Sequence, residues 1–120
     1  MSAQSFASRN EMDLPSLKTG VLLSTVPETT AFRDGVKAAA TSLARGARTF
    51  VYCIDDAVRG TGDTELQALR QQGLILYACA YGAKRRGLPI NDLATFVGLG
   101  VLGDILAGTD EFLSFNGAHE

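Results

Sequence analysis

The chain has 120 residues, of which 46% are apolar and 20% are charged, with 11 lysines and arginines against 13 acidic residues and a net charge of −2. This composition predicts one globular domain and excludes collagen-like, coiled-coil and disordered chains. The near balance of charge argues against nucleic acid as a direct partner, because nucleic-acid-binding domains carry a basic face.

The apolar runs of the sequence are far shorter than the roughly 20 residues that a membrane helix needs. The first 16 residues carry Arg9, Glu11 and Asp13 and lack the apolar stretch of a secretory signal. We therefore expect a cytoplasmic protein with no membrane partner, in which residues 1–17 form an N-terminal tail and residues 18–120 form the domain.

The chain has two cysteines, Cys53 and Cys79, and one histidine, His119. In a reducing compartment the cysteines are expected to be free thiols rather than a structural disulfide. His119 has no cysteine or histidine neighbour in the sequence that would complete a zinc site, so we expect no metal.

From Lys18 onward, short apolar runs alternate with apolar residues at helical spacing. This alternation predicts an α/β fold built on a parallel sheet. Residues 20–24 form a mostly apolar run, which is typical of a buried parallel strand. Pro27 and Glu28 then suit the first turn of a helix, because proline needs no N–H there and a carboxylate meets the positive end of the helix dipole.

The first helix is predicted from an apolar stripe along one of its faces, and Gly46 is expected to end it. The stripe consists of Phe32, Val36, Ala39, Ala40 and Leu43.

Residues 49–54 form a β-branched and aromatic run that predicts a second strand, which ends just before Asp55 and Asp56. Thr64 and Gln67 then fit a capping box at the start of a short helix.

A third strand is predicted for residues 74–78, and Cys79 stands where this strand gives way to the next helix. A fourth strand is expected at residues 94–97, followed by a last amphipathic helix and an edge strand at residues 111–115. The expected fold is a single α/β domain with a five-stranded, mostly parallel sheet and helices on both faces, in a flavodoxin-like three-layer arrangement.

Cys79 is the first candidate for chemistry, because ligands of open parallel sheets bind beyond the C-terminal ends of the strands. A thiol in the first turn of a helix meets unpaired backbone N–H groups and the positive end of the dipole, which favour the thiolate. The alternative is that Cys79 is a small buried residue that ends a strand. Cys53 is interpreted as core packing, because Asp55 and Asp56 follow it and oppose thiolate formation.

The strand order decides how close the two cysteines lie. If the first strand lay between the strands that carry Cys53 and Cys79, as in the flavodoxin-like order 2-1-3, their Cα atoms would be about 9–10 Å apart. A disulfide requires a separation of less than about 7 Å, so intramolecular oxidation is not expected in that arrangement.

Lys84, Arg85 and Arg86 follow Cys79 at five to seven residues, which is about 7–10 Å along a helix axis. We expect them to add a positive field at the sulfur and to reach a bound anion. The alternative is that they complement the helix dipole and are solvated. Tyr81 is expected to line the site or, alternatively, to pack or contact another subunit.

Asp55 and Asp56 resemble part of a metal or phospho-acceptor site. Such a site needs a further aspartate at the third strand end, where this sequence has Cys79, and a later lysine, but no lysine follows Lys84. The pair is therefore interpreted as the start of a loop. The loop over residues 55–63 is either a mobile lid or an ordinary surface connection.

The segment LILYACAYGAKRRGLP resembles the DsrE/DsrF-like sulfur-relay family, which includes the TusD-type subunits of tRNA thiolation. The matching features are a strand, a cysteine at its end, small residues in the next turn, and Arg85, Arg86 and Gly87 six to eight positions after Cys79. The later stretch FVGLGVLGDILAGTDEFLSF resembles the closing region of that family, so the resemblance covers about residues 18–115.

The resemblance implies that Cys79 accepts sulfane sulfur as a persulfide from a donor protein and passes it to an acceptor thiol. This transfer is related to thiol–disulfide exchange. The residues then expected to bind the substrate or partner are Tyr81, Lys84, Arg85 and Arg86. The helix end and the nearby cations are expected to stabilise the anionic persulfide. The resemblance implies no metal or organic cofactor. It implies assembly into trimers or hexamers, homomeric or mixed, of which we expect the homo-oligomer.

Two other functions remain open. One is a non-catalytic oligomeric module that binds a small anion or a protein at the strand ends, for which Arg85 or Arg86 would be essential and Cys79 would not. The other is a thiol redox sensor, which would form a Cys79 disulfide between subunits on mild oxidation.

Overall fold

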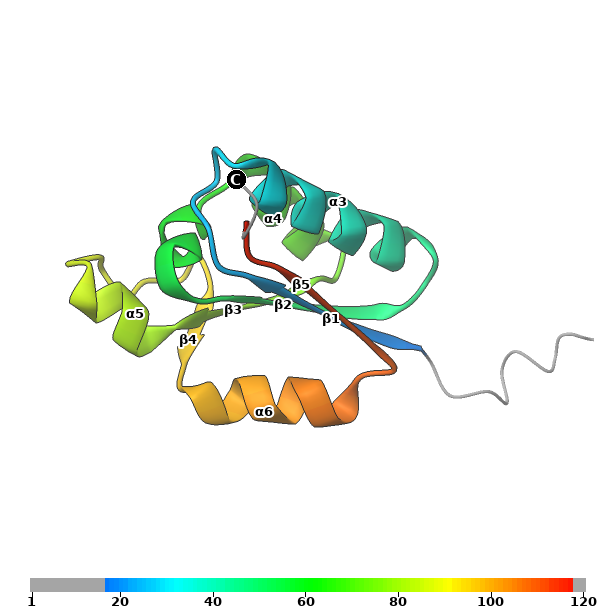
Figure 1. Ribbon diagram of the computed structural model, residues 1–120. Coiled ribbons are helices and arrows are strands. Elements are labelled where there is room, and N and C mark those ends of the chain that lie inside the picture. Colours follow the sequence, from blue (N-terminus) through cyan, green and yellow to red (C-terminus); the bar gives the residue numbers. More distant parts are fainter. Residues whose placement is uncertain (1–16, 118–120) are drawn as a thin grey trace, which may run out of the picture.

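Five strands form one sheet in the order β4-β3-β2-β1-β5, and every neighbouring pair is parallel (Figure 1). The computed structural model describes residues 17–117, so most of the expected tail, residues 1–16, and His119 lie outside the described residues. The strands are β1 (Lys18–Leu23), β2 (Arg48–Cys53), β3 (Ile75–Cys79), β4 (Thr95–Val97) and β5 (Glu111–Phe115). The prediction of a five-stranded parallel sheet with residues 111–115 at its edge is confirmed.

Helices cover both faces of this sheet, as expected. The helices α3 (Thr30–Ala44) and α4 (Thr64–Gln71) lie on one face, and α6 (Leu99–Gly108) lies on the other (Figure 1). The 3-10 helix η1 (Asp55–Gly60) follows β2 directly, and α5 (Ala80–Arg85) follows β3 directly. These two short elements therefore stand at the C-terminal edge of the sheet, where parallel α/β folds bind ligands.

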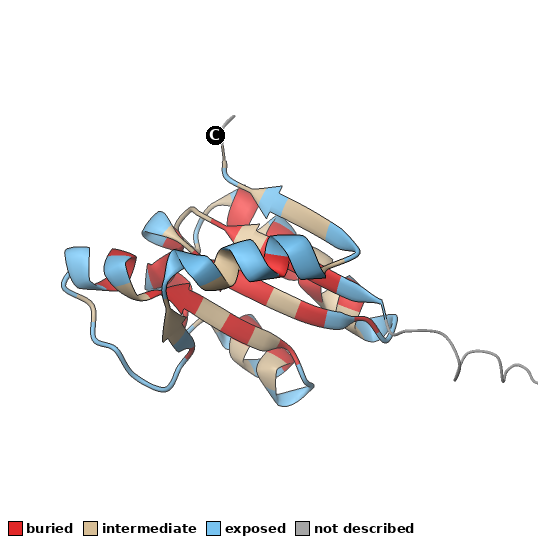
Figure 2. Cartoon of the chain, turned by 90° about the horizontal axis from the view of Figure 1, so that it is seen from below, coloured by how far each residue is buried: buried red, intermediate tan, exposed pale blue. Residues whose placement is uncertain are grey.

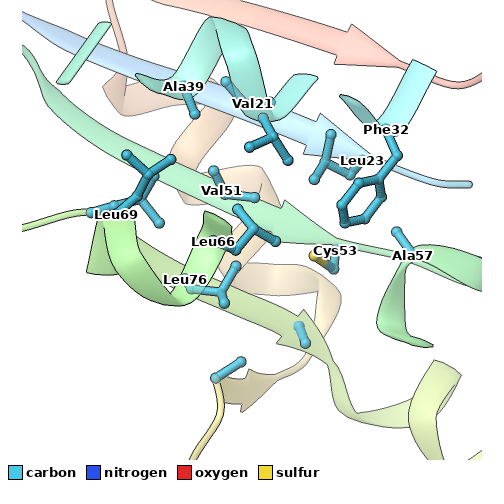
Figure 3. Close-up of a cluster of buried hydrophobic side chains, with 14 residues drawn as sticks. Val21, Leu23, Phe32, Ala39, Val51, Cys53, Ala57, Leu66, Leu69 and Leu76 are labelled. Atoms are coloured by element: carbon cyan, nitrogen blue, oxygen red, sulfur yellow. The ribbon is translucent and has the colours of Figure 1, made fainter. Parts of the chain in front are cut away.

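The main core lies between the sheet and the helices α3 and α4. Phe32, Val36 and Ala39 from the predicted stripe are buried there, together with Leu66 and Leu69 from the neighbouring helix α4. Figure 3 shows the side chains of α3 and α4 that it labels pointing toward the strands, with the sulfur of Cys53 among them. The apolar spacing in the sequence therefore identified the buried face of α3 correctly.

The start of α3 differs from the expectation. Pro27 and Glu28 precede the helix, and Thr29 is its N-cap, with a side-chain oxygen that accepts a hydrogen bond from the N–H of Phe32 at 3.1 Å. Threonine at this position satisfies a backbone donor of the first turn, which proline cannot do. The helix is followed as predicted by Gly46, whose φ of 87° is readily adopted only by glycine.

The start of α4 is also one residue away from the prediction. Asp63 is the N-cap, and its carboxylate accepts a hydrogen bond from the N–H of Leu66, whereas Thr64 is the first helical residue. The capping-box prediction for Thr64 and Gln67 is wrong because Gln67 instead donates to the carbonyl oxygens of Thr61 and Leu93.

The strand order differs from the flavodoxin-like order 2-1-3. Here β2 lies between β1 and β3, so the strands that carry the two cysteines are direct neighbours. The register pairs Cys53 with Ala78 and Tyr52 with Tyr77. Because β2 and β3 are parallel neighbours, their C-terminal ends lie next to each other.

The face covered by α6 is less completely buried than the other. Figure 2, which views the molecule from the α6 side, shows exposed residues along the outer surface of this helix. Leu99 and Leu106 are 58% and 52% exposed. Within residues 17–117, no helix has the length and apolar character required to cross a membrane.

Candidate functional site

Cys79 lies at the junction between β3 and α5. It is the last residue of the strand and the N-cap of the helix, and its Sγ accepts a hydrogen bond from the backbone N–H of Gly82 at 3.3 Å. The side chain is largely covered, with 4% of the residue exposed. The sequence therefore placed the cysteine correctly at a strand end beside the first turn of a helix.

Cys79 lines a pocket of about 570 Å³ at the C-terminal edge of the sheet. The walls come from the end of β2 with η1, from α5, and from the first residue of α6. The lining includes Arg59, Cys79, Tyr81, Arg85, Arg86 and Leu99. One sulfur and three guanidinium groups thus share a single concave surface.

Arg86 connects the two short elements that flank the pocket. Its Nε donates to a carboxylate oxygen of Asp56 at 2.8 Å, and its Nη1 donates to the carbonyl oxygen of Gly82 at 3.1 Å. The hydrogen bond from Arg86 is the main reason that the pKa of the Asp56 carboxyl is lowered, with further contributions from the charges of Arg86 and Arg59. Arg86 is therefore held in place by η1 rather than free in solvent.

Arg85 and Tyr81 form the outer part of the pocket. Within the described residues Arg85 makes no ion pair, and its guanidinium carbon lies 5.9 Å from the centre of the Tyr81 ring. Tyr81 is 68% exposed, so it is available to a partner rather than packed in the core. Lys84 is exposed on α5 but does not line the pocket in the described part of the chain.

Tyr52 belongs to this site although the sequence did not single it out. It is 1% exposed and packs in the same cluster as Cys79 and Val58. Its hydroxyl donates to the carbonyl oxygen of Gly98 at 3.1 Å. Burial raises its pKa first of all, and the charge of Cys79 and a hydrogen bond with the Cys79 side chain raise it further. In the sequence, Tyr52 was indistinguishable from the other apolar residues of its strand.

Cys53 is separated from this site by the sheet itself. Side chains alternate between the two faces of a strand, and Cys53 points into the core under α3 and α4 whereas Cys79 packs on the α6 side. Burial, with a smaller contribution from Asp63, raises the pKa of the Cys53 thiol to about 12. Both cysteines are free thiols, and their opposite orientation explains why adjacent strands do not produce a disulfide.

Asp55 and Asp56 begin η1, which agrees with their interpretation as the start of the connection after β2. Asp55 adopts a φ of 52°, a left-handed conformation that aspartate tolerates better than most residues. Among the residues that the structure describes, no three His, Cys, Asp or Glu side chains gather closely enough to hold a metal ion.

These features define an α/β protein with a cysteine and several arginines at the C-terminal edge of a parallel sheet. No protein-family model matches the chain, and no curated protein sequence matches it. Its structure is similar to the crystal structure of the ychN protein from E. coli, with a TM-score of 0.71 and 18% sequence identity over 82% of this chain and 99% of that chain. The likeness shows that the two proteins share this α/β fold.

Proposed function

We propose that this protein is a sulfur carrier in which Cys79 accepts sulfane sulfur as a persulfide and passes it to an acceptor thiol. The observation that carries this proposal is the position of the Cys79 sulfur. It ends a parallel strand, accepts a hydrogen bond from the Gly82 N–H, and lines a pocket that also contains three arginines. The resemblance of residues 18–115 to the DsrE/DsrF-like sulfur-relay family supports the same function, and the α/β fold shared with the ychN protein agrees with it.

The transfer consists of two balanced steps. In the first, the Cys79 thiolate attacks the outer sulfur of the donor persulfide, a new S–S bond forms to Cys79, and the donor cysteine leaves as a thiolate. In the second, an acceptor thiolate attacks the outer sulfur on Cys79, and Cys79 leaves as a thiolate. Neither step changes the net oxidation state, so no additional oxidant or reductant is required.

The groups around Cys79 suit a sulfur anion. Hydrogen bonds to charged acceptors are stronger than those between neutral groups, so the Gly82 N–H favours a negatively charged sulfur. Arg59, Arg85 and Arg86 outnumber the two aspartates of the pocket and favour an anionic substrate. We assign Tyr81 and Arg85 to partner contact at the pocket opening, and we assign Lys84 to long-range attraction only, because it lies outside the pocket.

The carrier function requires donor and acceptor proteins, and we propose that the protein acts with them in the cytoplasm as a homo-oligomer, either a trimer or a hexamer. Support for self-association comes from the exposed leucines of α6, Leu99 and Leu106. Large exposed apolar side chains on one face are typical of surfaces that contact another protein.

Persulfide loading tests the proposal directly. The protein is incubated with glutathione persulfide, and added sulfur is located by mass spectrometry of peptides prepared under non-reducing conditions. We expect one added sulfur atom on Cys79 in the wild type and in Cys53→Ser, and none in Cys79→Ser. If Cys79→Ser gains as much sulfur as the wild type, the assignment of Cys79 is wrong.

A non-catalytic anion-binding module is the second candidate, and the limited exposure of Cys79 favours it. In that case the arginines bind the ligand and the sulfur is only part of the wall. Calorimetric titration with thiosulfate distinguishes the two functions. A module of this kind keeps its affinity in Cys79→Ser and loses it in Arg85→Glu.

A further inference from the structure

The hydroxyl of Tyr52 has one proton and two acceptors within reach. It donates to the carbonyl oxygen of Gly98 at 3.1 Å, and Tyr52 packs in the same buried cluster as Cys79. The Cys79 side chain lies close enough to help raise the pKa of the phenol, after burial. Because a phenol carries a single O–H, it can donate to only one of these two acceptors at a time.

The strand register produces this arrangement. Tyr52 on β2 pairs with Tyr77 on β3, and Cys79 is two residues beyond Tyr77. Residues two apart on a strand lie on the same face, so Tyr52 and Cys79 both point toward α6. Gly98 is the N-cap of α6, the helix that covers this face of the sheet, and its carbonyl oxygen accepts the hydrogen bond from Tyr52.

We propose that Tyr52 is a positioning residue for Cys79, whose hydroxyl moves its hydrogen bond from the Gly98 carbonyl to Cys79 Sγ whenever that sulfur is a thiolate. With a neutral thiol, the carbonyl oxygen is the better acceptor. With a thiolate, the charged sulfur is the better acceptor, because hydrogen bonds to ionised groups are about twice as strong as neutral ones.

Both steps of the transfer pass through the Cys79 thiolate, which is the nucleophile in the first step and the leaving group in the second. The importance of Tyr52 for sulfur transfer therefore rests on the proposed function, whereas its effect on the thiolate does not. Tyr52 remains a proton donor throughout because its burial keeps the phenol protonated.

Apart from the tyrosine that is replaced, the ionisable groups around Cys79 are the same in every variant considered below. Those lining the pocket come from η1 and from α5 with its C-cap, and they are Asp55, Asp56, Arg59, Tyr81, Arg85 and Arg86. The side chains of β4 and α6 in the same cluster are apolar, namely Val97, Val101, Leu102 and Ile105. A change confined to the Tyr52 oxygen therefore reports on that hydroxyl alone.

The test is the pH dependence of Cys79 alkylation by iodoacetamide in Tyr52→Phe, with Tyr77→Phe as the matched control in the adjacent strand. We expect the midpoint of the rate profile to rise by about one pH unit in Tyr52→Phe, which is a roughly tenfold lower rate below the midpoint. The profile of Tyr77→Phe should equal that of the wild type. Equal midpoints in Tyr52→Phe and the wild type would overturn the proposal.

Replacement of Tyr52 by 3-fluorotyrosine keeps the test valid if Tyr52→Phe does not fold. The fluorinated phenol is more acidic and donates a stronger hydrogen bond, so the midpoint is expected to fall below that of the wild type. An unchanged midpoint refutes the role of the hydroxyl. Because alkylation needs no sulfur donor, a shifted midpoint without persulfide loading refutes the carrier function alone, and loading without a shift refutes the role of Tyr52 alone.

Discussion

Cys53 makes the folded state sensitive to alkaline pH. Its side chain is fully buried under α3 and α4, and burial, followed by the charge of Asp63, raises its pKa from the ordinary value of 9.0 to about 12. In the unfolded chain the thiol returns to its ordinary pKa. Between these two values the unfolded state binds fewer protons than the folded state, so the free energy of unfolding falls as the pH rises.

The magnitude follows from the difference between the two pKa values. Each pKa unit corresponds to about 1.4 kcal/mol, so an interval of roughly three units limits the total loss to about 4 kcal/mol. The stabilising contribution is complete well below pH 9.0 and is lost progressively toward about pH 12. Between pH 8 and pH 10 the linkage relation gives a loss of about 1.4 kcal/mol from this thiol.

Urea unfolding at pH 8 and pH 10, followed by circular dichroism, measures this loss. We expect the free energy of unfolding to fall by about 1.4 kcal/mol more in the wild type than in Cys53→Ala, which lacks the thiol. Val51→Ala is the control, because it creates a cavity on the same strand face but keeps the thiol, so it should retain the wild-type pH dependence. If Cys53→Ala loses as much stability as the wild type between the two pH values, the thiol is not kept protonated by burial.

Three further predictions concern reactivity and packing. Iodoacetamide at pH 8 should alkylate Cys79 but not Cys53 in the folded protein, because burial keeps the Cys53 thiol protonated; peptide mass spectrometry that finds equal labelling contradicts this. Gly35→Ala should lower the free energy of unfolding in urea by about 1–3 kcal/mol, since the added methyl group collides with the buried Leu23 side chain. Gly103→Ala in α6 should raise the free energy of unfolding by roughly 0.5–1 kcal/mol, because alanine favours a helix more than glycine does. The added methyl group has room, since it meets nothing within 4 Å apart from the backbone of its own helix. A loss of stability in the same unfolding experiment contradicts this.

Most elements were predictable because their signals are local. The apolar stripe of α3 includes Phe32 and Val36, whose spacing follows from the helical period, and both are buried as that spacing predicts. The strand β2 is a β-branched and aromatic run. The strand β5 lies at the edge of the sheet, as predicted.

Helix starts were predicted less well because several residue types compete for the cap. Pro27 and Glu28 are favourable in a first turn, but Thr29 has the oxygen that accepts from the Phe32 N–H, and the helix begins after it. The hydrogen bond from a backbone N–H to the side chain of the cap residue, rather than the general preference of a residue type, decides where the helix starts.

The strand order could not be obtained from local patterns. The orders 2-1-3 and 3-2-1 are built from the same three strands. They differ in which strand lies in the middle, and the residue pattern of a single strand does not specify this. Tyr52 was missed for this reason, because its proximity to Cys79 depends on β2 and β3 being neighbours. Once that adjacency is known, the alternation of side chains places Tyr52 and Cys79 on one face.

The different environments of the two cysteines depend on a single residue of register. Cys53 pairs with Ala78, so Ala78 shares the core under α3 and α4 and the next residue, Cys79, points to the other face. Because the side-chain period of a strand is two residues, a shift of one residue in β3 would bury Cys79 in the same core as Cys53. The sulfur would then lose the pocket, the Tyr52 hydroxyl and the arginines of α5 together. The chemistry proposed for Cys79 therefore depends as much on the pairing of β2 with β3 as on the helix that begins beside it.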